Sequence, residues 1–112
     1  MPGIRLSLIA TIVVLVVAVA ASMAMAATRS VGVRKSGATR YLFTPSSLTI
    51  SRGDTVRWSW RGTVAHNVAG PGFRSRVATR LTYSRTFRRA GTFRVVCQIH
   101  QTAGQRMTIR VR

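Results

Sequence analysis

The chain has 112 residues, of which 18 are lysine or arginine and only one is acidic, so its formal net charge is +17. This length allows one small domain, and the single cysteine excludes an intramolecular disulfide that would stabilise it. The basic residues are spread along the chain rather than gathered into a tail or an RNA-binding motif, so no nucleic-acid partner is expected.

Residues 1–27 predict an export signal. One cation, Arg5, precedes a long uncharged stretch that ends in small residues, among them "AMA" at 24–26. This layout is typical of a secretory signal peptide and favours cleavage before Ala27, but a hydrophobic run longer than about 18 residues can also remain as a membrane anchor. We therefore expect an N-terminal hydrophobic helix, removed or retained through residues 6–26, and a domain delivered to the periplasm, the cell envelope or the medium.

The rest of the chain divides into a short connection and a folded domain. Residues 28–40 are rich in glycine, serine and arginine, which predicts a linker with a short strand near Val31–Val33. Residues 41–112 predict the domain itself, because short candidate strands alternate with turn residues about every 8–12 positions, as in an all-β sandwich or barrel.

Alternating apolar and polar residues predict the strands of this domain and the face that each one buries. The segment "YSRTF" at 83–87 breaks this pattern, because Arg85 falls on its inward face between Tyr83 and Phe87. Either this strand lies at a sheet edge or the Arg85 side chain extends outward to solvent. The sole acid, Asp54, falls in a turn and is expected to pair with a neighbouring arginine. The predicted inward positions are Val56, Trp58 and Trp60; Phe93, Val95 and Cys97; and Gln105, Met107, Ile109 and Val111.

This alternation also predicts a polar cluster at one end of the domain. Cys97 closes one strand on its inward face, His100 follows three residues later, and Gln105 opens the next strand facing inward. A buried amide needs a partner, and the only other histidine is His66. One thiolate and two imidazoles with a weak axial group form the ligand set of a blue-copper site. Zinc is the alternative metal, since cysteine and histidine also bind it.

The ordered segments "FTPSSLTISRGDTVRW", "HNV", "GFRS" and "YSRTFRRAGTFRVVCQIH", with the closing strand, resemble the cupredoxins, in particular the small plastocyanin-like and amicyanin-like blue copper proteins. The resemblance covers nearly all of residues 40–112. It implies a Greek-key β-sandwich or barrel that holds one type 1 copper. His66, Cys97 and His100 then correspond to the equatorial ligands, and Asn67 corresponds to a residue that braces the ligand loops by hydrogen bonds.

The sequence departs from this family at the axial position. Plastocyanin-like loops place a methionine where this chain has Gln105. Met107 is the alternative axial ligand, but it lies two residues, or roughly 6–7 Å, further along the strand. Its parity with the apolar residues that follow it is typical of a core residue. We therefore expect Gln105 in the axial position, with a lower reduction potential than a methionine ligand would give.

These observations predict an exported type 1 copper protein that transfers single electrons between redox proteins of the envelope. A copper-binding module for storage, delivery or tolerance is the first alternative, and a metal-free structural envelope domain is the second. An enzyme is not expected, because no histidines remain for a second copper centre and no nucleophile lies beside a base.

The charge of the chain bears on its partners. The predicted outward arginines favour an acidic redox protein as docking partner, or retention near an anionic membrane or cell-wall surface. Nothing in the sequence predicts self-association, so a monomer is expected. The outward arginines are Arg57, Arg61, Arg94, Arg110 and Arg112.

Overall fold

The computed structural model describes residues 3, 12–14 and 25–112. The predicted N-terminal hydrophobic helix falls almost wholly outside these residues. In the part of the chain that is described, no helix is long and apolar enough to cross a membrane.

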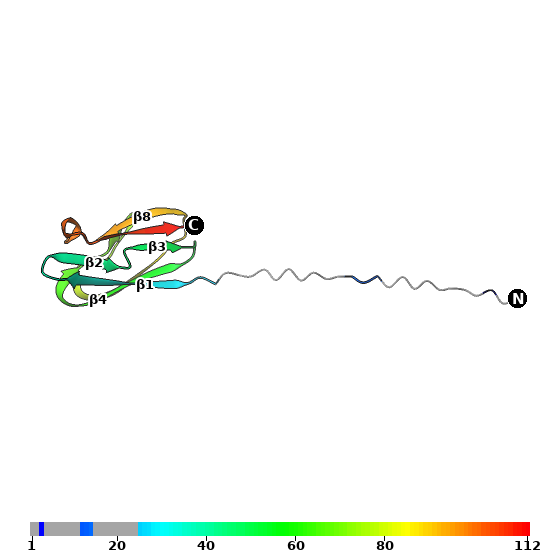
Figure 1. Cartoon of the computed structure of the whole chain (residues 1–112), viewed down its shortest axis with the longest axis horizontal. Coiled ribbons are helices and arrows are strands. Elements are labelled where there is room, and N and C mark those ends of the chain that lie inside the picture. The colour runs from blue at the N-terminus through cyan, green and yellow to red at the C-terminus, as the bar shows by residue number, and fades with distance from the viewer. Residues whose placement is uncertain (1–2, 4–11, 15–24) are drawn as a thin grey trace.

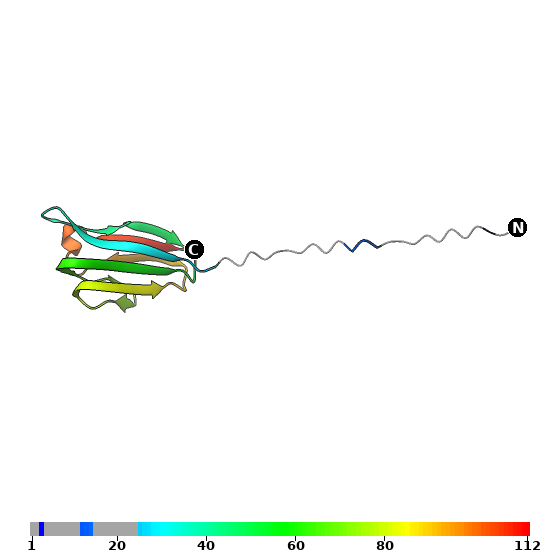
Figure 2. The same ribbon diagram turned by 90° about the horizontal axis from the view of Figure 1, so that it is seen from below.

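Residues 28–111 form two β-sheets packed face to face, which confirms the all-β prediction (Figures 1 and 2). One sheet has the strand order β2-β1-β4-β7 and the other β3-β9-β8-β5-β6. Both sheets are mixed, because β1 runs parallel to β4 and β3 runs parallel to β9. The strands are β1 (Thr28–Ser36), β2 (Arg40–Thr44), β3 (Ser47–Ile50), β4 (Thr55–His66), β5 (Ala69–Gly70), β6 (Phe73–Arg74), β7 (Ala78–Thr86), β8 (Gly91–Val96) and β9 (Arg106–Val111), with a 3-10 turn, η1 (Gln101–Ala103).

The core lies between the two sheets and follows the predicted alternation. Trp58 at its centre is fully buried, and its indole Nε1 donates a hydrogen bond to the sulfur of Met107 on the opposite sheet, at 3.2 Å. Among the predicted inward residues only Phe93 is not fully enclosed, and it packs against Phe87 at the margin of the core. Strand alternation therefore predicted the buried faces of β4, β8 and β9.

The prediction of a linker over residues 28–40 is wrong for most of that segment. Residues 28–36 form β1, a nine-residue strand that pairs with β2 on one side and with β4 on the other. Val31 and Val33 face the core, so the short predicted strand is its central part. The apolar alternation covers only three residues, and the rest of β1 is stabilised by backbone pairing, which leaves no pattern in the sequence. The folded domain thus begins at Thr28 and not at residue 41.

Strand β7 lies at the edge of its sheet, as expected for "YSRTF". The side chain of Arg85 stays exposed and places its guanidinium carbon 5.3 Å from the centre of the Phe73 ring. A cation over an aromatic face is attracted by the ring quadrupole. An arginine on the inward parity is therefore accommodated, because an edge strand lets it reach past the core to the surface.

The predicted ion pair of Asp54 is wrong for the part of the chain that the structure describes, where no arginine hydrogen-bonds to its carboxylate. Its carboxylate accepts backbone hydrogen bonds from Ala27 and Ser51, each at 2.9 Å. These bonds lower the pKa of Asp54, and the nearby charge of Arg29 acts in the same direction. Two amide donors therefore satisfy the only acidic side chain of the chain, at the end of the sandwich where β4 begins.

Candidate metal centre

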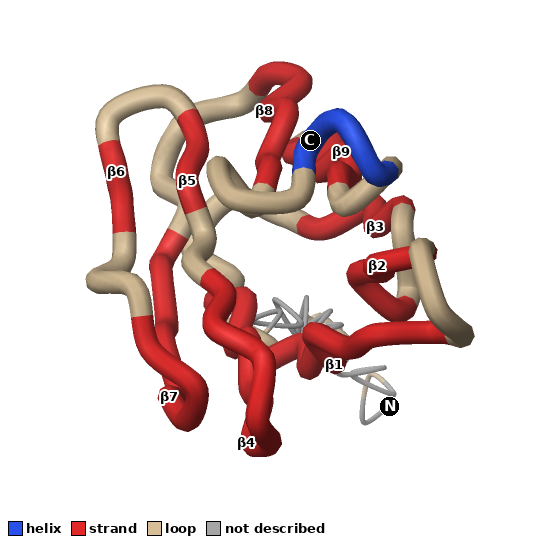
Figure 3. The backbone as a smooth tube through the Cα atoms, turned by 90° about the vertical axis from the view of Figure 1, so that its left-hand side faces the viewer, coloured by secondary structure: helices blue, strands red, loops and turns tan. Residues whose placement is uncertain are grey.

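The site lies at the other end of the sandwich, where β4 ends and η1 caps the opening between the sheets (Figures 1 and 3). His66 is the last residue of β4, and the pairing register of β4 with β7 shifts between Arg61 and His66. Such irregularities re-aim a side chain at a sheet margin. His66 is only 3 % exposed and points between the two sheets.

Cys97 and Gln105 are held side by side at the ends of β8 and β9. The backbone N–H of Cys97 donates to the carbonyl of Gln105 at 3.0 Å, which closes the loop between them. Within the loop, the N–H of His100 donates to the carbonyl of Cys97, and Gly104 takes a φ of 89°, a conformation that favours glycine. The short loop therefore turns His100 back over Cys97.

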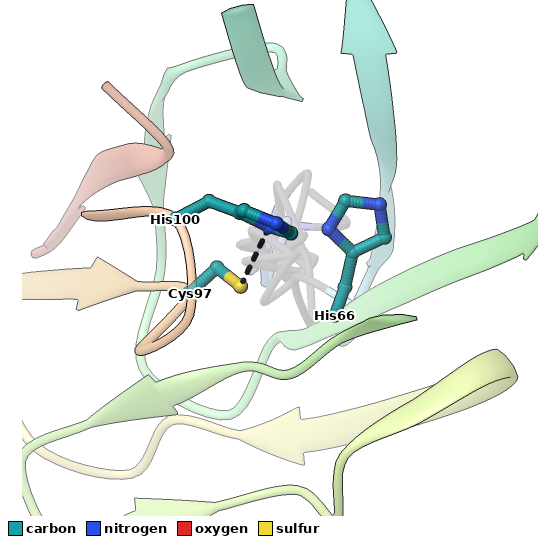
Figure 4. Close-up of side chains that lie close together, drawn as sticks. All are labelled: His66, Cys97 and His100. Carbon is teal, nitrogen blue, oxygen red and sulfur yellow. Dashed lines mark hydrogen bonds between the residues drawn. The ribbon is translucent and has the colours of Figure 1, made fainter. Parts of the chain in front are cut away.

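The three side chains point toward one another in Figure 4. One potential ligand atom from each of His66, Cys97 and His100 lies within 4.8 Å of the other two. The Sγ of Cys97 lies 3.7 Å from Nδ1 of His100. A metal bound in one plane at about 2.0–2.3 Å separates its three donors by about 3.5–4.0 Å. The cluster therefore fits a single ion with little movement of the side chains.

Gln105 completes the cluster and is fully buried. Its Oε1 lies 2.9 Å from Nδ1 of His66 and 3.2 Å from Nδ1 of His100. Its Nε2 donates to the carbonyl of Leu42 in β2, at 3.1 Å. This bond fixes the orientation of the amide, so the oxygen and not the nitrogen faces the two imidazoles. The Nδ1 atoms of both histidines thus lie within hydrogen-bonding distance of the same amide oxygen.

Met107 does not join the cluster. It lies in the core with 3 % exposure, and its sulfur accepts the hydrogen bond from Trp58 described above. The structure thus brings four of the predicted site residues together, and it engages the sulfur of the alternative axial residue with Trp58.

Asn67 links the two loops that carry the cluster. Its side-chain oxygen accepts a hydrogen bond from the backbone N–H of Gln98, and its Nδ2 donates to Oε1 of Gln98, both at 2.8 Å. Its backbone N–H donates to the Sγ of Cys97 at 3.5 Å. The segment after His66 is therefore tied directly to the segment after Cys97, and the sulfur has a fixed hydrogen-bond donor.

Tyr41 is a site residue that sequence reasoning missed. Its ring stacks on the imidazole of His100, with the centroids 3.7 Å apart and the planes 2° from parallel. Tyr41 lies in β2 next to Leu42, whose carbonyl orients Gln105. No spacing in the sequence points to this contact, because it depends on where β2 lies relative to the ligand loop. Strand β2 thus positions both His100 and Gln105.

Burial favours the uncharged form of His66. Desolvation lowers the pKa of this imidazole, the contact with Gln105 opposes that effect, and the neighbouring His100 lowers the pKa further. A neutral imidazole has a free electron pair on nitrogen, as a metal ligand requires. The donor set therefore consists of two imidazole nitrogens, one sulfur and one amide oxygen, in the protonation state that metal binding needs at His66.

Comparison with known proteins identifies the fold. No protein-family model matches the chain, and no curated protein matches it significantly. Among solved structures, a methionine-to-glutamine variant of amicyanin with Cu(I) is 27% identical, with a TM-score of 0.62 over 76% of this chain and 82% of that one. The oxidised plastocyanin of Dryopteris crassirhizoma is 19% identical, with a TM-score of 0.63 over 75% of this chain and 100% of that one.

A purple cupredoxin from Nitrosopumilus maritimus is 22% identical, with a TM-score of 0.60 over 74% of this chain and 98% of that one. The predicted resemblance to the cupredoxins is therefore confirmed: the chain has a cupredoxin-like fold with a His–Cys–His cluster at one end. Amicyanin structures are 25–27% identical to this chain, a higher identity than that of the plastocyanin or the purple cupredoxin.

Proposed function

We propose that this chain is an exported type 1 copper protein that carries single electrons between redox partners. The observation that supports it most is the convergence of His66, Cys97 and His100, whose donor atoms lie within 4.8 Å of one another. Copper bound to such a set supplies a one-electron couple between Cu(I) and Cu(II). The similar structures named above include a Cu(I) amicyanin, and cupredoxins are electron carriers.

The protein's own groups prepare this site before an ion binds. The Cys97 sulfur binds as a thiolate and receives the N–H of Asn67, while the two histidines offer Nδ1. Tyr41 holds the ring plane of His100 through stacking. Donors that are already oriented change little between the two oxidation states, which keeps electron transfer fast. His100 is only partly buried and lies beside the exposed Ile99, so we assign electron entry and exit to this edge.

Loading with Cu(II) tests the proposal. The purified protein should turn intensely blue, and Cys97→Ser should abolish the colour because the charge-transfer band needs the thiolate. Thr102→Ala is the matched control, since it changes an exposed side chain in the same loop and should leave the spectrum intact. A colourless copper complex of the unaltered protein would contradict a type 1 site, and failure to bind copper at all would favour a metal-free structural domain.

Gln105 is the proposed axial ligand. The bond from its Nε2 to Leu42 aims Oε1 at the cluster, whereas the sulfur of Met107 is engaged by Trp58. A hard oxygen donor stabilises Cu(II), so Gln105→Met should raise the reduction potential, as measured by cyclic voltammetry. Met107→Leu is the control and should leave the potential nearly unchanged. A shift with Met107→Leu and none with Gln105→Met would reverse the assignment.

Copper handling is the alternative that the same site permits. A storage or delivery module usually offers an open site or additional methionine ligands, but Met107, the one methionine within the β-sandwich, has its sulfur bonded to Trp58. Reversible voltammetry with slow loss of Cu(I) to a chelator supports electron transfer. Rapid loss of Cu(I) to the chelator, without a reversible couple, would favour copper handling.

The docking partner is proposed to be acidic. Arg61 and Arg80 are directly paired across β4 and β7, and with Arg34 they line a groove on the outer face of that sheet. A second groove joins Arg34 and Arg61 to His66, which brings this charge to the metal end. Such a face steers an acidic protein toward the site, with rates that fall as salt rises.

A paired set of variants locates the docking face. Arg61→Gln with Arg80→Gln should slow electron transfer to an acidic redox protein at low salt. Arg94→Gln with Arg110→Gln removes the same charge from exposed positions on the other sheet and should slow it less. Equal slowing by both pairs would show that only net charge matters and would contradict this docking face.

A further inference from the structure

Among the described residues, Ala27 is the first that hydrogen-bonds to the β-sandwich. Its backbone N–H donates to Oδ1 of Asp54 at 2.9 Å, and its carbonyl accepts the N–H of Thr55 at 2.9 Å. Met25 is 90 % exposed, and Ala26 is exposed as well. Ala27 therefore stands at the boundary between the sandwich and the segment that precedes it.

The group that receives this N–H is unusual for the chain. Asp54 is the only acidic residue among 112 and is 9 % exposed. Its second oxygen accepts the N–H of Ser51, in a turn where Gly53 takes a φ of 93°. Among the described residues, no guanidinium hydrogen-bonds to this carboxylate. A negative charge is thus held against the backbone nitrogen of Ala27.

We propose that the chain is cleaved between Ala26 and Ala27 and that Asp54 is the binding site for the N-terminal ammonium so created. A signal peptidase adds water across this peptide bond: the C–N bond breaks, Ala26 keeps the carboxylate, and Ala27 keeps the nitrogen, which takes up a proton at neutral pH. Small residues at positions 24 and 26 fit the preference of such peptidases. The cleavage rests on the export proposed above.

Cleavage changes the chemistry of the contact without moving it. Before cleavage, an amide N–H donates to Asp54; afterwards, an ammonium donates to the same oxygen. The bond from the amide is already assisted by the charge of the carboxylate. The ammonium adds a direct Coulomb attraction between two opposite charges. Because Thr55 holds the carbonyl of Ala27, the new terminus cannot swing away. The start of β1 is therefore fastened more firmly in the processed chain than in its precursor.

The charged groups around Asp54 set the pH range in which this fastening acts. Arg29 of β1 is the cation that acts on Asp54, and Arg52 lies in the turn, where its N–H donates to the carbonyl of Arg112. Arg88 follows Phe87, whose N–H donates to the carbonyl of Asp54. These arginines stay charged over the range tested. The carboxylate of Asp54, whose pKa is lowered, stays ionised there as well, so the N-terminal amine is the group of this contact that titrates.

The first experiment determines the cleavage site. The full-length chain is expressed in a bacterial host, and the exported product is examined by intact mass and N-terminal sequencing. The expected terminus is Ala27. A product that begins at any other residue, or that is exported without cleavage, would overturn the proposal, whereas a chain that stays in the cytoplasm would overturn the export on which it rests.

The second experiment tests the ammonium contact and does not depend on export. Residues 27–112 contain all the strands and core residues that the structure describes, so a chain that begins at Ala27 can be studied directly. Lys35 is the only lysine, and in a Lys35→Arg background the N-terminus is the only amine. Selective acetylation then gives a matched pair that differs in one charge.

Thermal unfolding of this pair is compared as pH rises from 6 to 10. An ordinary α-amino group has a pKa of about 8, and a carboxylate partner raises it in the folded state. The contact therefore stabilises the fold fully below the ordinary pKa of the amine. This stabilisation is lost as pH rises through the raised pKa of the amine in the folded state. The free amine should lose stability relative to the acetylated chain over this range, and Asp54→Asn should abolish the difference. Parallel curves for the free and acetylated chains would overturn the proposal.

Discussion

The two ends of this sandwich both bury polar groups, but they satisfy them differently. At the end where β4 begins, one carboxylate is bonded by two backbone amides, so the chain completes this cluster by itself. At the end where β4 finishes, a thiol, two imidazoles and an amide oxygen converge from the end of β4 and from the loop between β8 and β9. Sulfur, imidazole nitrogen and amide oxygen are the donor types that bind a transition-metal ion. The end with Asp54 therefore stabilises the fold, and the end with Cys97 and the two histidines offers a metal site.

The largest expected effect follows from binding a metal ion at the end of the sandwich where β4 finishes. Zn²⁺, which has no colour or redox activity, should raise the free energy of unfolding by about 4 kcal/mol when free metal is 1,000 times its Kd. Denaturant titration with and without metal measures this. Cys97→Ser should lose most of the gain, whereas Asp54→Asn should keep it. An equal gain in both variants would show that metal binds elsewhere.

A smaller effect is expected from the aromatic contact at the same end. Tyr41→Leu should cost about 0.5–1.5 kcal/mol beyond the lost buried area, because it removes the stacking on His100. It should also change the visible spectrum of the Cu(II) protein. Tyr83→Leu is the matched control, since it removes a half-buried ring packed near Trp58, away from the site. If both variants left the spectrum unchanged, Tyr41 would have only a structural role.

The contribution of Asp54, at the end where β4 begins, is tested by measuring stability at acidic pH. The pKa of Asp54 lies below its usual 3.8 because the N–H groups of Ala27 and Ser51 favour the charged carboxylate. Its stabilisation is therefore full above that usual value and is lost as pH falls through the lowered pKa. Unfolding midpoints measured from pH 7 to pH 2 should show Asp54→Asn less stable at neutral pH, with the difference shrinking in acid. A constant difference would contradict this.

The smallest effect concerns the charged face between the two ends. Arg61 and Arg80 are opposite one another on neighbouring strands, and like charges in such pairs are destabilising. Arg80→Gln should therefore raise stability by about 0.2–1 kcal/mol at low salt, and the gain should vanish at high salt. Arg94→Gln, whose cross-strand neighbour is Thr108, should give a smaller gain. Equal gains would indicate a general effect of net charge.

Strand alternation predicted much of the fold because burial on one face leaves a period of two in the sequence. This worked for Trp58, Val95 and Ile109, each of which is fully buried. It failed for β1, where only Val31 and Val33 face the core and backbone pairing to two neighbours stabilises the remainder. It also misplaced the partner of Asp54, because backbone amides leave no trace in residue identity.

The sequence by itself determined the chemistry of the site: one cysteine, two histidines and an inward glutamine, three of them within a single loop whose spacing brings them together. Only the tertiary structure decided that Tyr41 stacks on His100 and that Leu42, 63 residues from Gln105, orients its amide. The physical reason is that local spacing and parity are properties of one segment. Which strands become neighbours, and in which register, is decided by the packing of the whole sandwich.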